Sequence, residues 1–311
     1  MNLYIILTIF TASFLVLYKS SEWVLKYSLI LSRKLKISTL VFGFIIVALS
    51  TSLPELMIAI FSSISGEVGL SVGNLLGANF FNLTIVLGIS ALSYKIISLT
   101  KKDEGDLIEL LFLSTLVTLL IFQGEQLSRV HGMILLVLFG MLVSKLYKGG
   151  RIRSEFYGNA SEPKRKLVLL FLISIILLLV SAHLMVKSAL ELADYLALAT
   201  TFVGMTITSI GTTLPELSVQ LRAIKNKEYG LAMGDLLGSC VVNLTLILGM
   251  LSIISPMKIK TSPLLLLLPF LFIAIFVVWY AITYKKKITR FEGAILIFLY
   301  VLFILEAFNI L

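Results

Sequence analysis

The stretch STSLPEL at residues 50–56 places a proline beside a glutamate in an otherwise apolar segment, and GTTLPEL at residues 211–217 repeats the arrangement. The constant shift in residue number that places residue 211 on residue 50 is called the repeat offset below. The same shift brings GDLLGSCVVNLTLILG at 234–249 onto GNLLGANFFNLTIVLG at 73–88. Between residues 39–90 and 200–251, 20 of 52 positions are identical without a gap. An internal repeat of this quality indicates that the chain is one structural unit written twice.

The composition is that of an integral membrane protein. Of the 311 residues, 59% are hydrophobic and 14% are charged, whereas soluble proteins contain about 45–50% apolar and about 25% charged residues. Hydrophobic blocks of membrane-spanning length follow one another along the whole chain. We expect an all-α fold in the lipid bilayer with ten spans, at 3–18, 38–63, 69–93, 107–122, 130–147, 166–186, 199–221, 230–254, 263–283 and 292–309.

Lys and Arg residues are distributed unevenly between the loops that join these blocks. If the loops alternate between the two faces of the membrane, one face receives about 22 of the 26 Lys and Arg residues, and the other receives only Arg129, Lys187, Lys258 and Lys260. Cytoplasmic loops carry such an excess of positive charge. We therefore expect a multi-pass protein of the cell membrane with both termini outside. The same bias explains the net charge of +9 without a nucleic-acid partner.

Each copy of the repeat would hold five spans, and an odd number of spans turns the second copy upside down. The loop charges agree, because SRKLKIS at 32–38 is basic while the matching ADYLALA at 193–199 has no basic residue. Inverted repeats are typical of secondary transporters, whose substrate site lies near the bilayer midplane. We expect a first five-helix repeat at 1–150, a short cytoplasmic linker at 151–165, and a second, inverted repeat at 166–311.

The two proline–glutamate pairs predict a cation site at that midplane. Pro54 lacks an N–H, and its ring clashes with the carbonyl of residue 50; Pro215 has the same effect on Gly211. Each helix should break just before its glutamate and release carbonyls that need protein, water or an ion as a partner. A charged acid inside a span costs about 2.5–3.5 kcal/mol or more, so Glu55 and Glu216 at equivalent inverted positions indicate a shared function.

Other oxygen ligands surround these carboxylates in the sequence. They are the hydroxyls of Thr51, Ser52, Thr212 and Thr213 and the amides of Asn82 and Asn243. Hard oxygen ligands without His or thiolate suit Ca²⁺ or Na⁺, whereas Mg²⁺ fits less well because it gives up its water reluctantly. We expect Ca²⁺ and monovalent cations as transported ions, and no cofactor.

Asp235 has two interpretations from the sequence alone. It matches Asn74 of the first copy, and it either caps a helix or contributes to the site. If only Glu55 and Glu216 are counted, the site has a formal charge of −2. One Ca²⁺ or two monovalent cations would neutralise that charge, which predicts nearly electroneutral exchange.

Functions of other classes find little support. An intramembrane enzyme would need a nucleophile or a metal-binding cluster, but Cys240 is the single cysteine, and His131 and His183 lie near the ends of different spans. A channel is disfavoured because inverted repeats with a closed midplane site are typical of transporters. Nothing in the sequence indicates an obligate protein partner.

The motifs STSLPE…GNLLGANFFN and GTTLPE…GDLLGSCVVN resemble the alpha repeats of the calcium/cation antiporter superfamily, and most closely its sodium/calcium exchanger branch. The resemblance covers nearly the whole chain and points to compact archaeal exchangers. It implies ten helices, antiport of Ca²⁺ against Na⁺ by alternating access, and no enzymatic activity. The ligands it implies are Thr51, Ser52, Glu55, Asn82, Thr212, Thr213, Glu216, Ser239 and Asn243, with the carbonyls of Ala48 and Ser209 in sodium sites.

Three positions depart from the family pattern. Ala78 stands where the family often has serine, Asn243 where some archaeal members have aspartate, and Ser50 where glycine is usual. The change at Ala78 removes a hydroxyl that would hold Na⁺. Exchange of Ca²⁺ against H⁺, or another cation/proton antiport on the same scaffold, is therefore the alternative to Na⁺ coupling.

Overall fold

The computed structural model describes residues 3–31, 47–94, 96–98, 101–123, 126–149, 164–258 and 261–308. Residues 38–46 of the second expected span and residues 151–163 of the expected linker lie outside the described part of the chain.

The described chain is almost entirely helical, as a bilayer requires of backbone groups that cannot bond to water. Its α-helices alternate with short π-helical turns, labelled η. The elements of the first half are α1 (Leu3–Leu31), α3 (Leu49–Thr51), α4 (Leu53–Ile64), α5 (Val68–Phe81), η2 (Asn82–Val86), α6 (Leu87–Tyr94), β1 (Ile96–Ser98), α7 (Lys101–Gln123), β2 (Gln126–Leu127) and α8 (Arg129–Gly149).

The second half largely repeats this order of elements. They are α9 (Lys164–Tyr195), α10 (Thr200–Val203), η3 (Gly204–Thr208), α11 (Ser209–Thr212), α12 (Leu214–Lys225), α13 (Tyr229–Val241), η4 (Val242–Ile247), α14 (Leu248–Ile254), β3 (Met257–Lys258), α15 (Thr261–Tyr280), η5 (Ala281–Lys285), β4 (Lys287–Thr289) and α16 (Arg290–Ala307).

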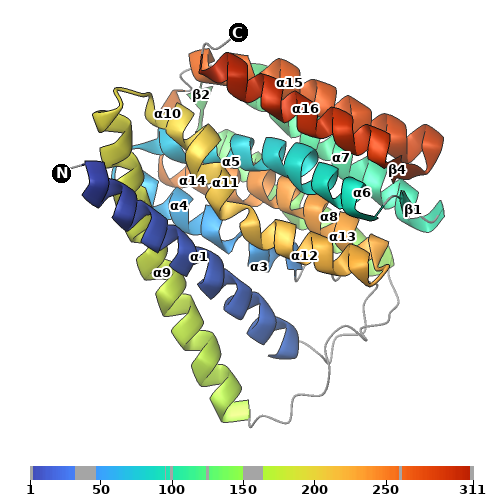
Figure 1. Ribbon diagram of the computed structural model, residues 1–311, viewed down its shortest axis with the longest axis horizontal. Coiled ribbons are helices and arrows are strands. Elements are labelled where there is room, and N and C mark those ends of the chain that lie inside the picture. Colours follow the sequence, from blue (N-terminus) through green and yellow to red (C-terminus); the bar gives the residue numbers. More distant parts are fainter. Residues whose placement is uncertain are drawn as a thin grey trace.

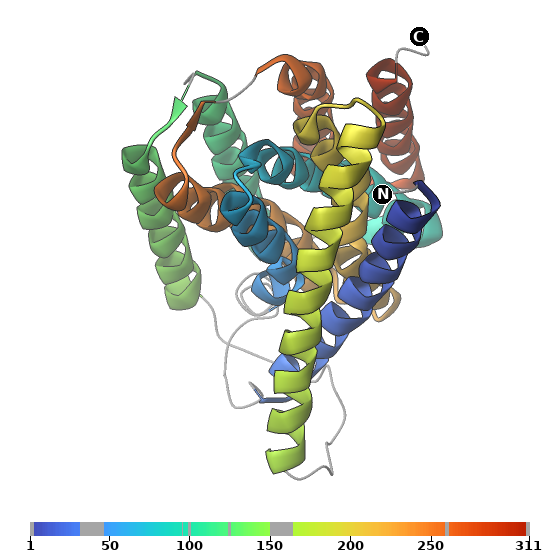
Figure 2. The ribbon, with the colours of Figure 1, turned by 90° about the vertical axis from the view of Figure 1, so that its left-hand side faces the viewer.

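Among the described residues, five helical runs are long and apolar enough to cross a membrane. They are Leu3–Ser20, Val68–Tyr94, Arg165–Tyr195, Tyr229–Ile254 and Leu264–Lys285. The described part of every expected block is helical for most of its length. However, α1 continues to Leu31 and α9 to Tyr195, well beyond the expected span ends at 18 and 186. These two helices pack against each other (Figures 1 and 2).

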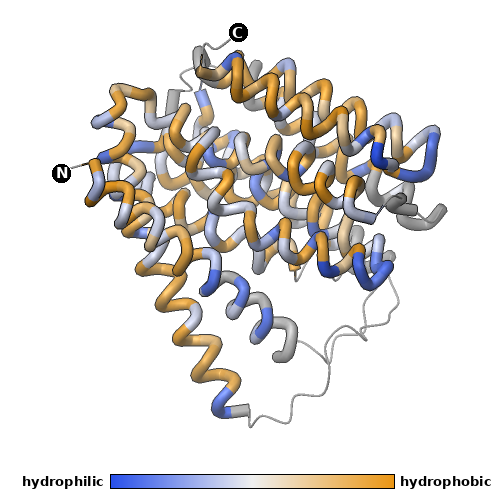
Figure 3. Tube along the Cα trace, in the orientation of Figure 1, coloured by the Kyte–Doolittle hydropathy of each residue, from blue (hydrophilic) through white to orange (hydrophobic). Residues whose placement is uncertain are grey.

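The helices form a buried centre with a more exposed periphery. The runs Val68–Tyr94 and Tyr229–Ile254 are 83% and 78% buried within the protein, whereas Leu3–Ser20 and Arg165–Tyr195 are 22% and 28% buried. The outer helices α9, α15 and α16 are hydrophobic along most of their length (Figure 3). The apolar side chains on the periphery therefore suit contact with lipid. The centre consists of α5–η2–α6, α13–η4–α14 and the short helices that pack on them.

Element bounds in the two halves correspond through the repeat offset. Helix α4 begins at Leu53 and ends at Ile64, and α12 begins at Leu214 and ends at Lys225. The first residues of α8 and α16 are also related by this offset. The correspondence extends over helices whose sequences show no clear identity.

Contacts between the halves occur in reciprocal pairs. A Cβ on Gly88 would lie 2.9 Å from the carbonyl oxygen of Gly293, and a Cβ on Gly132 would lie 2.7 Å from that of Gly249. Gly249 is the repeat equivalent of Gly88, and Gly293 is that of Gly132. Helices α6 and α16 thus meet as α14 and α8 do.

Two short antiparallel strand pairs, which the sequence did not predict, follow the same rule. Strand β1 pairs with β4 with Ile97 opposite Ile288, and β2 pairs with β3 with Leu127 opposite Met257. Each pair joins loops from different halves of the chain. Under the repeat offset, β1 corresponds to β3 and β2 corresponds to β4. The pair formed by β1 and β4 is therefore the repeat equivalent of the pair formed by β3 and β2.

Candidate cation site

Glu55 and Glu216 lie in the first turns of α4 and α12 and are almost completely buried, with 0% and 1% of their surface exposed. The two carboxylates are within electrostatic range of each other. None of their four carboxylate oxygens has a hydrogen-bond donor. Two carboxylates buried in this way need positive charge or protons to be tolerated.

The prolines kink the polypeptide before each glutamate without interrupting it. Helix α3 ends at Thr51 and α4 begins at Leu53, so the bend falls on Ser52, whose φ and ψ are −80° and 7°. The Ser52 N–H still donates to the Ala48 carbonyl at 3.0 Å. The expected break is therefore a kink at Ser52, just ahead of Glu55, since a proline within the first helical turn needs no N–H partner.

The second kink has the same form. Helix α11 ends at Thr212 and α12 begins at Leu214, and the Thr213 N–H donates to the Ser209 carbonyl at 3.2 Å. The Ser209 carbonyl also accepts from the hydroxyls of Thr212 and Thr213, at 3.3 and 2.8 Å. The Ala48 carbonyl likewise accepts from the Thr51 hydroxyl at 3.2 Å. The two carbonyls implied as sodium ligands are thus buried beside the kinks, where hydroxyls contact them.

Hydroxyl groups connect each kink to the central helix of the other half. The Thr51 Oγ1 donates to Asp235 Oδ1 at 3.2 Å and lies 3.2 Å from Ser239 Oγ. In the other half, Thr212 Oγ1 donates to Asn74 Oδ1, also at 3.2 Å. The Glu216 carboxylate lies beside Thr51 and Ser239, and the Glu55 carboxylate lies beside Thr212, although neither approach is close enough for a hydrogen bond.

Amide groups complete the site from the starts of the π-helical turns. Asn82, the first residue of η2, is fully buried, and neither its oxygen nor its nitrogen has a hydrogen-bond partner. Asn243 in η4 donates its Nδ2 to Asn79 Oδ1 at 3.0 Å, which leaves its own Oδ1 without a donor. A π-turn is often found at a functional site, and here it places an amide on each side of the centre.

Several of the buried oxygens without hydrogen-bond partners lie on residues beside the two kinks and on the central helices of both halves. Among them are Ser52 Oγ, both carboxylate oxygens of Glu55 and of Glu216, Asn82 Oδ1, Asp235 Oδ2 and Asn243 Oδ1. Buried polar atoms in proteins are nearly always paired. Oxygen atoms left without donors form the environment that a hard cation such as Ca²⁺ or Na⁺ requires.

Close helix packing brings these groups together. A Cβ on Gly73 would lie 2.0 Å from the Thr201 carbonyl oxygen, and one on Gly77 would lie 2.2 Å from that of Met205. Only glycine allows α5 to approach the backbone of α10 and η3 so closely. This contact positions α5, and with it Asn74 and Asn79, against the segment that leads to Glu216.

Residues 5–148 and 166–308 match the family described as sodium/calcium exchanger protein. The chain belongs to the sodium/calcium exchanger family. The resemblance seen in the alpha repeats is thereby confirmed, and the chain is a multi-pass membrane protein of a cation antiporter family.

Three curated relatives of this exchanger cover most of its length. An uncharacterized membrane protein of Methanocaldococcus jannaschii is 29% identical over 94% of this chain and 95% of its own. The inner membrane protein YrbG of Escherichia coli is 30% identical over 79% and 78%, respectively. The sodium/calcium exchanger MaX1 of Methanosarcina acetivorans is 26% identical over 94% and 96%.

Solved structures of the sodium-calcium exchanger NCX_Mj are similar over almost the whole chain. The one soaked with 10 mM Na⁺ and zero Ca²⁺ has a TM-score of 0.70 at 27% identity and covers 96% of this chain and 97% of that one. The one soaked with 2.5 mM Na⁺ and 0.1 mM Sr²⁺ has a TM-score of 0.71 at 26% identity, with coverages of 97% and 98%.

Some buried polar residues of the exchanger escaped the sequence analysis. Asn74 could have been found as the repeat equivalent of Asp235, but Asn79 corresponds to Cys240 and gave no repeated signal. Gln220, one turn beyond Glu216 on α12, is fully buried with neither side-chain polar atom paired. Its equivalent is Ala59, so only its place on the Glu216 face of a helix could have indicated it.

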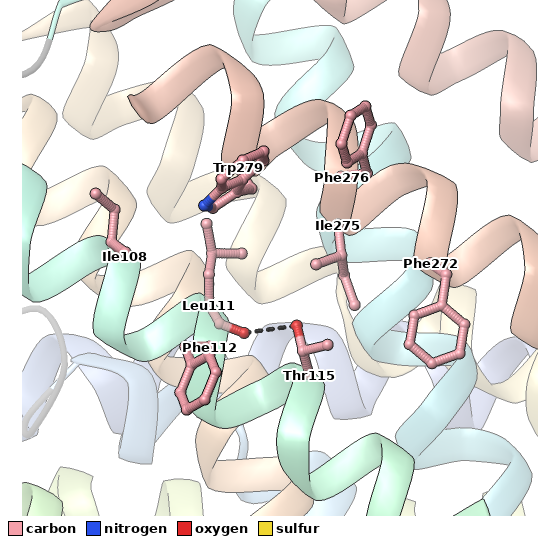
Figure 4. A pocket seen from close by; sticks show the side chains of 8 residues that line it. All are labelled: Ile108, Leu111, Phe112, Thr115, Phe272, Ile275, Phe276 and Trp279. Carbon is pink, nitrogen blue, oxygen red and sulfur yellow. Dashed lines mark hydrogen bonds between the residues drawn. The ribbon is translucent and has the colours of Figure 1, made fainter. Parts of the chain in front are cut away.

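A separate groove of the exchanger lies between α7 and α15 (Figure 4), and its lining shares no residue with the cation site. Its volume is about 460 Å³, and it is lined by Ile108, Leu111, Phe112, Thr115, Phe272, Ile275, Phe276 and Trp279. The Thr115 hydroxyl donates to the Leu111 carbonyl at 2.7 Å. The lining of this groove is mostly apolar, so it does not supply the several oxygen ligands that a cation such as Ca²⁺ requires.

Proposed function

We propose that the protein exchanges Ca²⁺ for Na⁺ across the membrane by alternating access, with both ions competing for the site around Glu55 and Glu216. The observation that carries the proposal is the set of buried oxygens without donors, contributed by equivalent elements of both halves. Carboxylate, hydroxyl, amide and carbonyl oxygens suit these two ions.

The site needs more than acidic side chains. Among the described residues, no group of three His, Cys, Asp or Glu side chains is arranged to hold a metal ion. A cation between the two glutamates would therefore depend on neutral oxygens, which we assign to Thr51, Ser52, Thr212, Thr213, Asn82, Asn243 and Ser239 and to the carbonyls of Ala48 and Ser209. Neutral ligands favour a site that releases its ion again, as transport demands.

We further propose ten membrane-spanning helices in two inverted repeats, with both termini outside. The reciprocal contacts of Gly88 with Gly293 and of Gly249 with Gly132 support a two-fold relation between the halves. An odd number of spans per half places the two-fold axis in the membrane plane. The midplane is then the only depth at which equivalent groups such as Glu55 and Glu216 can meet.

Uptake of ⁴⁵Ca²⁺ into proteoliposomes tests the function. Liposomes loaded with Na⁺ and diluted into K⁺ medium should accumulate ⁴⁵Ca²⁺, and those loaded with K⁺ at the same pH should not. An imposed pH gradient without Na⁺ should drive no uptake. Uptake driven by the pH gradient alone would instead assign the protein to Ca²⁺/H⁺ exchange, and uptake that needs no counter-ion gradient would assign it to a channel.

A further inference from the structure

Gln220 is a buried polar residue outside the ligand set around Glu55 and Glu216, which is called the central site below. It lies on α12 four residues after Glu216, so the two side chains share one face of the helix. No part of Gln220 is exposed, and within the described part of the chain neither its amide oxygen nor its amide nitrogen has a hydrogen-bond partner. A buried amide without partners is unfavourable, so a water molecule or an ion is the partner that such a group needs.

The repeat equivalent of Gln220 shows that the fold does not require an amide at this position. That residue is Ala59, which lies four residues after Glu55 on α4 and is also buried. Helices α4 and α12 have equivalent neighbours, because α4 packs on η4 and α14 as α12 packs on η2 and α6. An apolar side chain therefore suffices for the packing, and the amide of Gln220 is additional to it.

A second polar group without a partner occurs on α6, one of the helices that α12 packs against. Ser90 is fully buried, and its hydroxyl has no hydrogen-bond partner among the described residues. Its repeat equivalent on α14 is Leu251. Gln220 in place of Ala59 and Ser90 in place of Leu251 both exchange an apolar residue for a polar one. Both polar residues lie on the elements of the same contact, whose equivalent in the other half has the two apolar ones.

Negative charge lies beside Gln220 on the side of the central site. Glu216 is one helical turn away, and Asp235 is fully buried on α13, which packs on α12. Asp235 lies nearly two helical turns after the N-cap residue Glu228, so the interpretation of Asp235 as a helix cap is wrong. Its Oδ1 accepts from the Thr51 hydroxyl at 3.2 Å, and its carboxyl group is within electrostatic range of Glu216. These charges attract a cation at Gln220 towards the central site.

We propose that the Gln220 amide oxygen is a ligand of a second cation position, one helical turn from Glu216. The transported ion occupies it between the central site and the membrane face at the Asn226 end of α12, which in the proposed topology is the cytoplasmic face. The inference rests on the proposed function. Amide and hydroxyl oxygens carry no net charge, so they replace part of the water around a hard cation and hold it weakly. Weak binding suits a position that an ion must leave as readily as it enters.

Exchange of ⁴⁵Ca²⁺ against Ca²⁺, in proteoliposomes with equal Ca²⁺ on both sides, measures ion passage without a counter-ion gradient. Gln220→Met nearly keeps the volume of the side chain and removes the amide. It should slow this exchange about 10-fold, as expected for the loss of one neutral polar partner. Gln220→Asn keeps an amide and should exchange at a rate between those of Gln220→Met and wild type. Leu217→Met is the matched control on the same helix, and it should exchange as wild type does.

Two further measurements on Gln220→Met distinguish a passing ion from a structural role. Its ⁴⁵Ca²⁺ affinity in detergent should stay within about twofold of wild type, because the ligands of the central site are unchanged. Its melting temperature should not fall, because the variant removes a buried amide without partners.

Three outcomes would overturn the role of Gln220 and leave the proposed function intact. They are exchange at the wild-type rate in Gln220→Met, equal exchange in Gln220→Met and Gln220→Asn, and a melting temperature of Gln220→Met below that of wild type. A large loss of ⁴⁵Ca²⁺ affinity would overturn the second position, because it would make Gln220 a ligand of the central site. Absence of ⁴⁵Ca²⁺ exchange in wild type would overturn the proposed function and this inference with it.

Discussion

The side-chain amide of Asn243 donates to Asn79 Oδ1 at 3.0 Å, and Asn79 in turn donates to the Cys240 carbonyl oxygen at 3.1 Å. These two hydrogen bonds connect the two halves, and they leave the Asn243 oxygen directed away from Asn79. Asn79 therefore acts as a positioning residue, since it fixes which end of the Asn243 amide is available to a cation.

We predict that Asn79→Ala weakens Ca²⁺ binding about 10-fold. The Asn243 amide would lose its acceptor and could present its N–H groups to the ion, and a buried hydrogen bond is worth about 0.5–1.5 kcal/mol. The measurement is ⁴⁵Ca²⁺ binding to purified protein. Cys240→Ser is the matched control, because it leaves the backbone acceptor of Asn79 in place and should bind Ca²⁺ normally. Equal affinities of Asn79→Ala and the control would contradict the positioning role.

We predict that Glu55→Gln and Glu216→Gln each reduce Ca²⁺ transport by more than about 100-fold while the protein still folds. Each change removes one of the charges that balance a divalent ion in a poorly solvated site. ⁴⁵Ca²⁺ uptake measures the effect, and elution as a single species on size exclusion reports the fold. Glu22→Gln is the control, because Glu22 pairs with the exposed Lys19 at 2.7 Å and such surface pairs contribute about 0–1 kcal/mol. Near-normal uptake by either site variant would rule out its glutamate as an essential ligand.

We predict that cysteines placed at Ser65 and Asn226 are labelled from opposite sides of the membrane. These exposed residues are repeat equivalents that follow α4 and α12. In the proposed topology, Ser65 faces outside, and Asn226, beside Lys225 and Lys227, faces the cytoplasm. An impermeant maleimide applied to intact cells and to inverted vesicles distinguishes the two sides. The native Cys240 is buried and provides an unlabelled background. Labelling of both positions from one side would disprove the inversion.

We predict that Gly73→Ala lowers the melting temperature by several degrees. The added Cβ would lie 2.0 Å from the Thr201 carbonyl oxygen, and backbone atoms cannot move aside as a side chain does. Overpacking of this kind typically costs about 1–3 kcal/mol. Gly140→Ala adds the same methyl group to a helix where no heavy atom lies within 4 Å, so it should leave the melting temperature unchanged or raise it slightly. Fluorescence-detected size exclusion after heating compares the two, and equal loss in both would contradict the packing argument.

The sequence predicted the helical fold and the burial of both glutamates because these follow from local patterns. A long apolar run determines a helix, and the Pro–Glu pair identifies a kink. The position of the kink at Ser52 and Thr213 was less accessible, since it depends on how much of the hydrogen-bond ladder survives around the proline.

Other features depend on contacts between distant residues. Clear identity between the halves is confined to 39–90 and 200–251, although the starts of α8 and α16 obey the repeat offset as well. Peripheral helices need only length and apolar character, so their side chains diverge without loss of structure. Pairing of β1 with β4 and the hydrogen bond of Asn79 with Asn243 join segments too far apart for any local pattern to indicate them.

The reciprocal glycine contacts have a consequence for how the two halves fit together. Both halves use the same two equivalent surfaces to contact each other. Such an interface is isologous, as in a symmetric homodimer. In the inverted topology that we propose, one half on its own would offer these surfaces to a second copy of itself inserted in the opposite orientation. Because both halves belong to one chain, equivalent positions can differ, as Asn74 differs from Asp235 and Asn79 from Cys240.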